Sequence, residues 1–252
     1  MLFQHAFLDT RWRFLIGLVV LPVSAAFVVF SYPQVMALSQ SVTTSPDTAL
    51  GREIAESIQL VKTYDGYVWS QWFRQNGAQL VGLFAAIIGT GGLLSQAAAS
   101  RLFTLSLPVS RERLLAARAA AGLSQMLALT MVPALVIVLM SPLVSRSFPL
   151  IDALAYALGA FAGGAVLFSL AFFLSSLFGN VWAPVVLTMC AGAALAALDQ
   201  ITGADRFSLL RMIHGDSYFH GLGLPWPMLL GSVLASSALV YAGIRHVARQ
   251  DF

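Results

Sequence analysis

The sequence predicts an all-α polytopic membrane protein that crosses the bilayer six times and forms a single domain over residues 1–252. Its composition supports this fold class, because 58% of the residues are hydrophobic and only 10% are charged. A soluble domain has about a quarter of its residues charged, so most of these side chains are expected to face lipid. The mean hydropathy of +0.81 agrees with this assignment.

The uncharged stretches between charged residues indicate where the six helices lie. A transmembrane helix needs about 20 residues, and the stretches 14–46, 75–100, 119–145 and 217–244 each hold one. The stretch 153–198 is long enough for two helices joined by a turn, and Gly179-Asn180 within 177–180 suits that turn. We therefore expect spans near 14–32, 78–98, 119–140, 153–175, 182–199 and 227–245.

Residues 1–13 predict a short helix that lies in the membrane interface. Apolar side chains such as Phe7 and Trp12 alternate there with polar ones such as Asp9 and Arg13, as in interfacial amphipathic helices. A secretory signal peptide is the competing interpretation. The apolar run that follows is too long for one, and no clear cleavage site comes after it.

The first predicted outer segment, 33–76, is too long to be a simple connection. Leu50, Ile54, Ile58 and Val61 recur at helical intervals after a capping sequence at 45–47, which predicts an outer amphipathic helix. Trp69, Trp72 and Phe73 follow it, just before the second span. We expect these three aromatic residues to anchor the span at the interface, in preference to forming a carbohydrate or lipid site.

The second predicted outer segment, 200–226, combines apolar and polar residues in a way that allows it to dip back into the membrane. His214, Asp216 and His220 within it raise the question of a metal site. Their spacing matches no established ligand motif, so we do not predict one.

The distribution of arginine predicts that both termini lie in the cytoplasm. With six crossings, the cytoplasmic segments have a net charge of +5 and the outer segments −2. The cytoplasmic set comprises Arg11, Arg13, Arg101, Arg111, Arg113, Arg118, Arg245 and Arg249, with Asp9, Glu112 and Asp251.

The stretch 101–118 is the candidate functional surface. Pro108 suits the first turn of a helix, in which Leu114 and Leu115 share one face while Arg111, Arg113 and Arg118 stay in water. Such a helix rests on lipid headgroups or presents its leucines to a cytoplasmic partner. An ordinary basic loop that only sets topology is the alternative.

The sequence lacks the residues that several other functions require. The one lysine of the chain, Lys62, lies in an outer segment, so the glycines at 89–92 cannot form a P-loop for ATP. The spans contain no ionisable residue near the bilayer centre for proton or ion coupling, since Asp152 and Asp199 lie at predicted outer ends. They also contain no histidine for an intramembrane protease. Gly159 and Gly163 are expected to pack helices. No basic and aromatic tract suggests nucleic-acid binding, and the lone Cys190 suggests packing.

The run LSLPVSRERLLAAR resembles the segment of ABC-2-type transporter permeases that leads from the second span into the coupling helix. Leu105, Leu107, Pro108, Ser110 and Arg111 carry this resemblance. Many relatives have acidic residues and a Gly-Thr pair just before the leucine-rich run, whereas this chain has Gln-Ala-Ala-Ala-Ser-Arg at 96–101. The resemblance extends more weakly over the whole chain, through six spans, a basic tail and short re-entrant helices before the sixth span.

The resemblance implies a permease subunit of an exporter in the bacterial cytoplasmic (inner) membrane. ATP would bind to a separate cytoplasmic ABC ATPase, a second permease subunit would complete the pore, and this chain would hold no cofactor or metal and no catalytic site. The alternative function is a non-transporting membrane-assembly or signalling component that docks a cytoplasmic partner. The residues implied to contact the ATPase are Leu107, Pro108, Val109, Ser110, Arg111, Glu112, Arg113, Leu114, Leu115 and Arg118.

Overall fold

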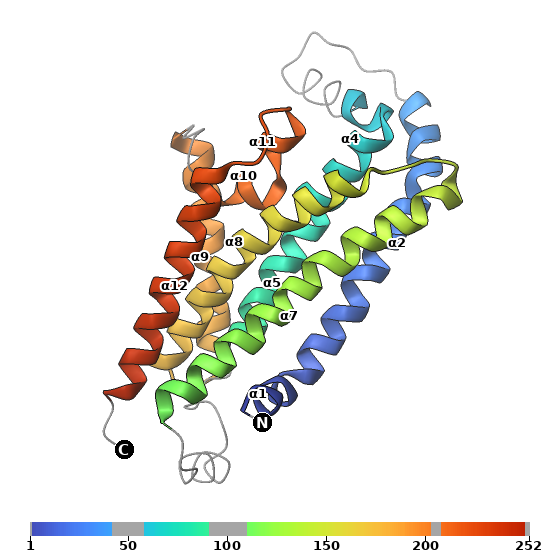
Figure 1. The fold of residues 1–252 in the computed structure, drawn as a ribbon. Coiled ribbons are helices and arrows are strands. Elements are labelled where there is room, and N and C mark those ends of the chain that lie inside the picture. Colours follow the sequence, from blue (N-terminus) through green and yellow to red (C-terminus); the bar gives the residue numbers. More distant parts are fainter. Residues whose placement is uncertain (1, 42–57, 91–109, 203–207, 250–252) are drawn as a thin grey trace.

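A computed structural model describes residues 2–41, 58–90, 110–202 and 208–249. These residues are almost entirely helical and include no β-strand. Figure 1 shows that helix α1 (Leu2–Asp9) and the last turn of helix α12 (Trp226–Ala248) lie at the same end of the bundle. We call this end the terminal end and the opposite one the distal end.

Among the described residues, four helices are long and apolar enough to cross a membrane. They are α2 (Arg11–Ser41), α7 (Arg111–Met140), α8 (Leu150–Leu177) and α12. These helices confirm the helical structure predicted for the first, third, fourth and sixth spans. Helix α2 continues to Ser41, well beyond the predicted end of the first span at 32, so residues 33–41 of the first predicted outer segment are helical.

The second and fifth predicted spans correspond to shorter helices. Helix α9 (Trp182–Thr202) has its apolar part at Trp182–Leu198. Helix α5 (Gly77–Gly89) continues directly from α4 (Tyr64–Val68) through a π-helical segment, η1 (Trp69–Asn76), and the predicted residues 91–98 lie outside the described part. That α5 and α9 cross the membrane, for a total of six spans, therefore stays a prediction.

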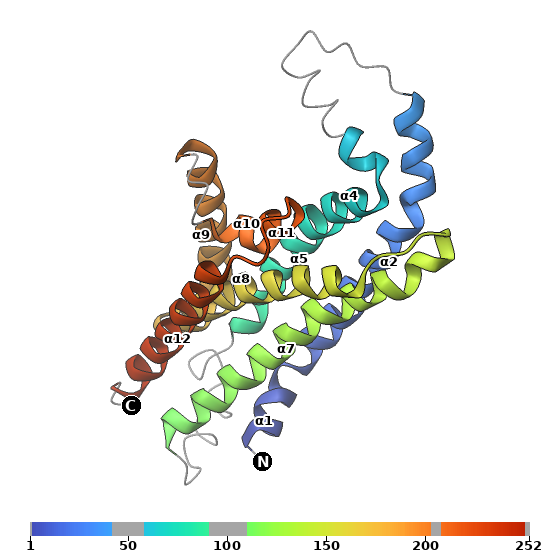
Figure 2. The same cartoon turned by 45° about the horizontal axis from the view of Figure 1, so that its top comes forward.

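Helix α8 is the central helix of the bundle, and it lies next to α7 and α12 in Figure 2. In its most apolar window 67% of the residues are buried, against 22% to 33% in α2, α7 and α12. The outer three helices therefore expose apolar side chains along much of their length, as lipid-facing helices do.

The predicted turn between the fourth and fifth spans is confirmed. Helix α8 ends at Leu177, and α9 begins at Trp182. The side-chain oxygen of Asn180 accepts a hydrogen bond of 2.8 Å from the backbone N–H of Ala183, which satisfies one free donor at the start of α9.

The glycines predicted to pack helices do so, and their partner is the short helix α10 (Leu209–His214). A Cβ atom at Gly159 would lie 2.6 Å from the carbonyl oxygen of Met212, and one at Gly163 would collide with the side chain of Ile213. The absence of side chains on this face of α8 therefore lets the backbone of α10 approach closely. A second short helix, α11 (Asp216–Phe219), links α10 to the approach of α12.

Trp69, Trp72 and Phe73 are buried, so the expectation that they anchor the chain at the interface is wrong. Their exposed fractions are 2%, 3% and 4%. The indole of Trp69 stacks on the ring of Phe219, with centroids 3.9 Å apart and planes 4° apart. These side chains form the distal part of the core because η1 packs against α10 and α5.

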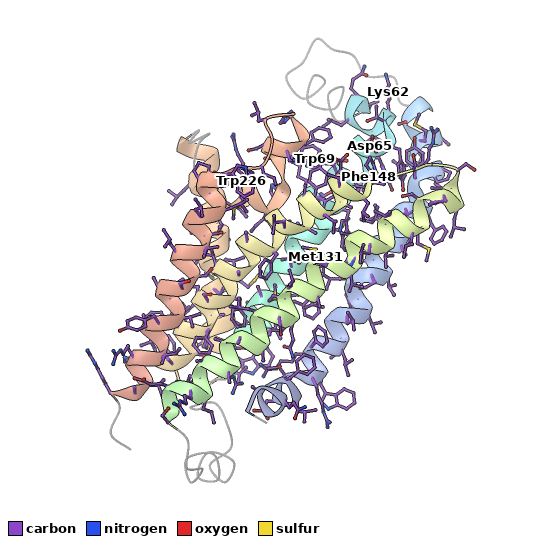
Figure 3. All side chains as sticks on the ribbon, viewed as in Figure 1. Lys62, Asp65, Trp69, Met131, Phe148 and Trp226 are labelled. Atoms are coloured by element: carbon purple, nitrogen blue, oxygen red, sulfur yellow. The ribbon has the colours of Figure 1, made fainter. Side chains whose placement is uncertain are left out.

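Three other tryptophans are exposed at helix starts instead. Trp12, Trp182 and Trp226 are 67%, 78% and 64% exposed. Trp12 and Trp182 begin helices at the terminal end, and Trp226 lies at the distal end, where Figure 3 labels it. This distribution is the one expected of interfacial aromatic belts.

Only part of the first predicted outer segment is described. Residues 58–62 are helical, and Val61 packs against the main core. Leu50, Ile54 and the capping sequence at 45–47 lie outside the described residues.

Candidate functional site

The stretch predicted to contact an ATPase lies at the terminal end, where α7 begins. Ser110 is the N-cap of α7, and its side-chain oxygen accepts a hydrogen bond of 3.4 Å from the backbone N–H of Arg113. Glu112 stands in the first turn, where a negative charge favours the helix dipole. Of the candidate residues, Leu107, Pro108 and Val109 lie outside the described part of the chain.

The sequence predicted a separate short helix here, but the residues from Arg111 onward do not form one. They are the first turns of α7, which continues without a break to Met140. The physical reason is local composition, because alanines around Arg118 propagate a helix well and no glycine or proline intervenes before Gly122. The described part of the candidate stretch, from Arg111 onward, and the third predicted span are thus one continuous helix.

The predicted apolar face of this stretch is already covered within the chain. Leu115 is 2% exposed and packs with Ala119, Phe172 of α8 and Val247 of α12. Leu114 is half-buried against the same group, so the expectation that both leucines face a partner is wrong for the described structure. We call this group the leucine cluster; it comprises Leu114, Leu115, Ala119, Phe172, Val240, Ile244 and Val247.

The polar residues beside the leucine cluster are the ones open to a partner. Ser110, Glu112 and Arg113 are exposed. Glu112 forms an ion pair of 3.6 Å with Arg245, which also donates a hydrogen bond of 2.9 Å to the hydroxyl of Tyr241. Both members of the ion pair are more than half exposed, so it adds little stability. It does place charged groups of α7 and α12 on one surface.

Arg118 does not lie in open water, contrary to the prediction. It is half-buried, and Asp9 of α1 and Arg13 of α2 act on it electrostatically. Arg13 uses its Nη1 to donate to the carbonyl oxygens of Ile87 and Thr90, at 2.9 and 2.7 Å. Those two bonds satisfy carbonyl groups at the C-terminal end of α5, which the helix itself cannot satisfy.

A buried polar contact that the sequence did not reveal attaches α1 to α7. The hydroxyl of Thr10 donates to the side-chain oxygen of Gln125 at 2.9 Å, and Gln125 is completely buried. Gln125 also donates to the backbone oxygen of Phe7 at 3.5 Å. A glutamine inside an otherwise apolar span is the signal that could have pointed to such a contact, because a buried amide needs partners.

The residues considered for a metal site at the distal end have other contacts. The carbonyl oxygen of His214 accepts a hydrogen bond from the indole of Trp69, and the ring of His220 meets that indole edge-on. In the described ranges, no three His, Cys, Asp or Glu side chains come together as metal ligands would.

The arrangement at the start of α7 is therefore a polar, charged surface supported by a packed apolar cluster. No protein-family model, curated protein or solved structure matches the chain.

Proposed function

We propose that the chain is the membrane-spanning permease subunit of an ABC-2-type exporter, driven by a separate cytoplasmic ATPase. One observation carries this proposal: the segment that resembles the coupling region of such permeases leads into an exposed polar surface at the start of α7. Ser110, Glu112 and Arg113 form the described part of that surface.

Transport driven by a partner requires that movement at the docking surface reach the spanning helices. Helix α7 provides a continuous path because it runs from Arg111 to Met140 and packs along α8. The leucine cluster joins the start of α7 to α8 and to the end of α12. A displacement of Arg113 would therefore act on three helices together.

This geometry assigns different roles to the candidate residues. Residues 107–113 would contact the ATPase, and Arg113 would attract acidic groups at the edge of the ATPase surface and so favour association. Leu114 and Leu115 would hold the docking surface on the bundle, since they are packed inside the chain. Arg118 would support the surface from the α1 side.

The remaining parts of the proposal follow the family resemblance. The chain would lie in the bacterial inner membrane with both termini in the cytoplasm, and a second permease subunit, identical or paralogous, would complete the pore. ATP would bind only to the ATPase partner, without any cofactor in this chain. Apolar faces on α2, α7 and α12 would contact membrane lipid.

The test is purification of the tagged chain from native membranes, followed by identification of its cytoplasmic partner and measurement of ATP hydrolysis. We expect a partner with Walker motifs, and we expect Arg113→Glu to reduce its recovery severalfold. Arg146→Glu is the matched control, because Arg146 is also exposed but follows α7 at the distal end. A partner without a nucleotide-binding motif would favour the membrane-assembly or signalling function instead.

Equal recovery of the ATPase with the Arg113→Glu and wild-type chains, at equal membrane expression, would remove the start of α7 as the docking surface. The permease assignment would then need another contact region.

A further inference from the structure

Two arginines at the terminal end face the same region from different helices. Arg118 lies on α7 about two turns before Gln125, and Gln125 accepts a hydrogen bond of 2.9 Å from Thr10, which precedes Arg13 by three residues. The two arginines therefore lie at the same junction of α1, α2 and α7, where their charges act on one another. Arg13 is held in place by its hydrogen bonds to Ile87 and Thr90 at the end of α5. Arg13 therefore borders the end of α5.

Within the described part of the chain, acidic side chains balance the positive charge of this pair only in part. Asp9 is the one described carboxylate whose charge acts on Arg118, and within the described ranges no side chain makes a hydrogen bond or ion pair with Arg118. The residues 91–109, which follow α5 in the chain, contain no Asp or Glu at all. A half-buried guanidinium loses part of its hydration and needs an acceptor to replace it.

Donor groups are available on both arginines. A guanidinium has five N–H donors in a planar fork, which suits the oxygens of a phosphate. Arg13 uses only its Nη1 in the described contacts, so its Nη2 and Nε are left for another acceptor. Arg118 can offer all the N–H donors of its guanidinium group to a phosphate.

The position of the pair along the bundle corresponds to the membrane interface. Trp12 is 67% exposed at the start of α2, beside Arg13, and Leu8 of α1 is 52% exposed. Tryptophan prefers the level of the lipid headgroups. The guanidinium of Arg11 lies 5.6 Å from the ring centroid of Trp12, which adds another positive charge at this level.

We propose that the phosphate group of an anionic phospholipid binds between Arg13 and Arg118, at the junction of α1, α2, α7 and the end of α5. The headgroup supplies an acceptor for both guanidinium groups, and the acyl chains lie along the apolar outer faces of α2 and α7. Basic pockets between spanning helices bind anionic headgroups in this manner. The proposal concerns lipid recognition and holds whether or not the chain works with an ATPase.

The test is native mass spectrometry of the full-length chain, stripped of lipid in detergent and titrated with phosphatidylglycerol, phosphatidylcholine or inorganic phosphate. We expect one phosphatidylglycerol to bind more tightly than phosphatidylcholine, which has the same phosphodiester without a net charge. Arg118→Gln should weaken that binding about tenfold, the loss expected for a charge-assisted hydrogen bond. Asp9→Asn should strengthen it, because the variant removes the competing carboxylate.

Arg113→Gln is the matched control, since it removes an exposed arginine from the same helix and should leave the affinity unchanged. Wild-type affinity in Arg118→Gln, or the same loss in Arg113→Gln, would overturn the proposed site. Inorganic phosphate that displaces the lipid at equal concentration would show a free-phosphate site and refute the lipid assignment. If Arg118→Gln does not fold, Arg118→Lys is the second variant, because it keeps the positive charge but removes the planar guanidinium. Wild-type affinity for phosphatidylglycerol in Arg118→Lys would also contradict the proposal.

Discussion

The indole N–H of Trp69 donates a hydrogen bond of 2.9 Å to the carbonyl oxygen of His214. This bond joins the π-helical segment η1 to the last residue of α10, although the two residues are far apart in the sequence. The same indole stacks on Phe219 of α11. Trp69 therefore holds both short helices of the distal end in place.

Trp69→Phe should keep most of the stacking with Phe219 but lose the hydrogen bond to His214. The expected cost is about 1 kcal/mol of unfolding free energy, because a buried carbonyl loses its partner. Trp69→Ala should cost about 3–5 kcal/mol, since it also leaves a cavity. Thermal unfolding in detergent measures both, and Trp226→Phe, at an exposed tryptophan, is the control. Equal losses for the two Phe variants would contradict the role given to this bond.

Gly159→Ala should displace α10 from α8, because the new Cβ atom would meet the carbonyl oxygen of Met212. Overpacking of this kind costs about 1–3 kcal/mol. Gly231→Ala on α12 is the control, since a Cβ atom there meets nothing within 4 Å. Unfolding temperature and protease sensitivity of the segment around α10 report the change. A Gly159→Ala protein as stable as Gly231→Ala would show that the contact is loose.

Leu115→Ala should lower the stability of the chain itself, by about 2–5 kcal/mol, because Leu115 is buried between α7, α8 and α12. Leu139→Ala, at a leucine of the same helix that is 71% exposed, should have a much smaller effect in detergent. The measurement is thermal unfolding of the purified chain without any partner. A stable Leu115→Ala chain that lost only its ATPase would show that this leucine faces the partner after all.

Asp65→Asn should stabilise the chain at neutral pH. Partial burial, followed by the negative charge of Asp152, raises the pKa of Asp65 above its usual range. A raised folded pKa favours folding below the unfolded pKa of about 4, and this contribution is lost as the pH rises through the folded pKa. The charged form is thus disfavoured at pH 7, and the effect is small because burial is only partial and much of the side chain stays in contact with water.

The unfolding temperatures of wild type and Asp65→Asn, measured at pH 4.5 and pH 7, test this expectation. The variant should gain more at pH 7 than at pH 4.5. A variant less stable than wild type at pH 7 would show that the charged carboxylate makes a favourable contact.

Topology reporters test the proposed orientation. Fusions at Gln40, Arg146 or Arg211 should report the outside, and those at Arg111 or Phe252 the cytoplasm, because the positive-inside rule favours only this orientation. The matched comparison is between Arg111, the first residue of α7, and Arg146, which follows the other end of that helix. A cytoplasmic signal at Arg211 would remove either the fifth crossing or the orientation.

The sequence predicted where helices lie much better than which side chains they bury. Charged residues are excluded from lipid-facing helices, so gaps such as 119–145 show the spans directly. Burial depends on partners distant in sequence: Trp69 is buried because α10 meets it, and no local pattern near Trp69 contains that information. An exposed interfacial tryptophan and a buried one look alike until the fold is known.

In the candidate site, too, local features could be predicted from the sequence and burial by distant residues could not. Its charged residues could be predicted, since charge is a local property. The start of its helix was predicted too early, because Pro108 was expected in the first turn whereas Ser110 is the N-cap. The burial of Leu115 could not be predicted, because Val247, which packs against it, lies far away in the sequence. The continuity of the stretch with α7 could have been predicted, as no residue between Arg111 and Gly122 breaks a helix.

Helix α7 also relates the protein to the thickness of its membrane. At 1.5 Å per residue its 30 residues extend about 45 Å, which is close to the thickness of a bilayer with its headgroups. Ser110 at one end and Ser141 at the other would therefore lie near the levels of the two headgroup regions, although the Ser141 hydroxyl is buried, 2.7 Å from that of Tyr64. A thinner bilayer would leave apolar turns of α7 in water or force the bundle to tilt, so activity should vary with acyl-chain length.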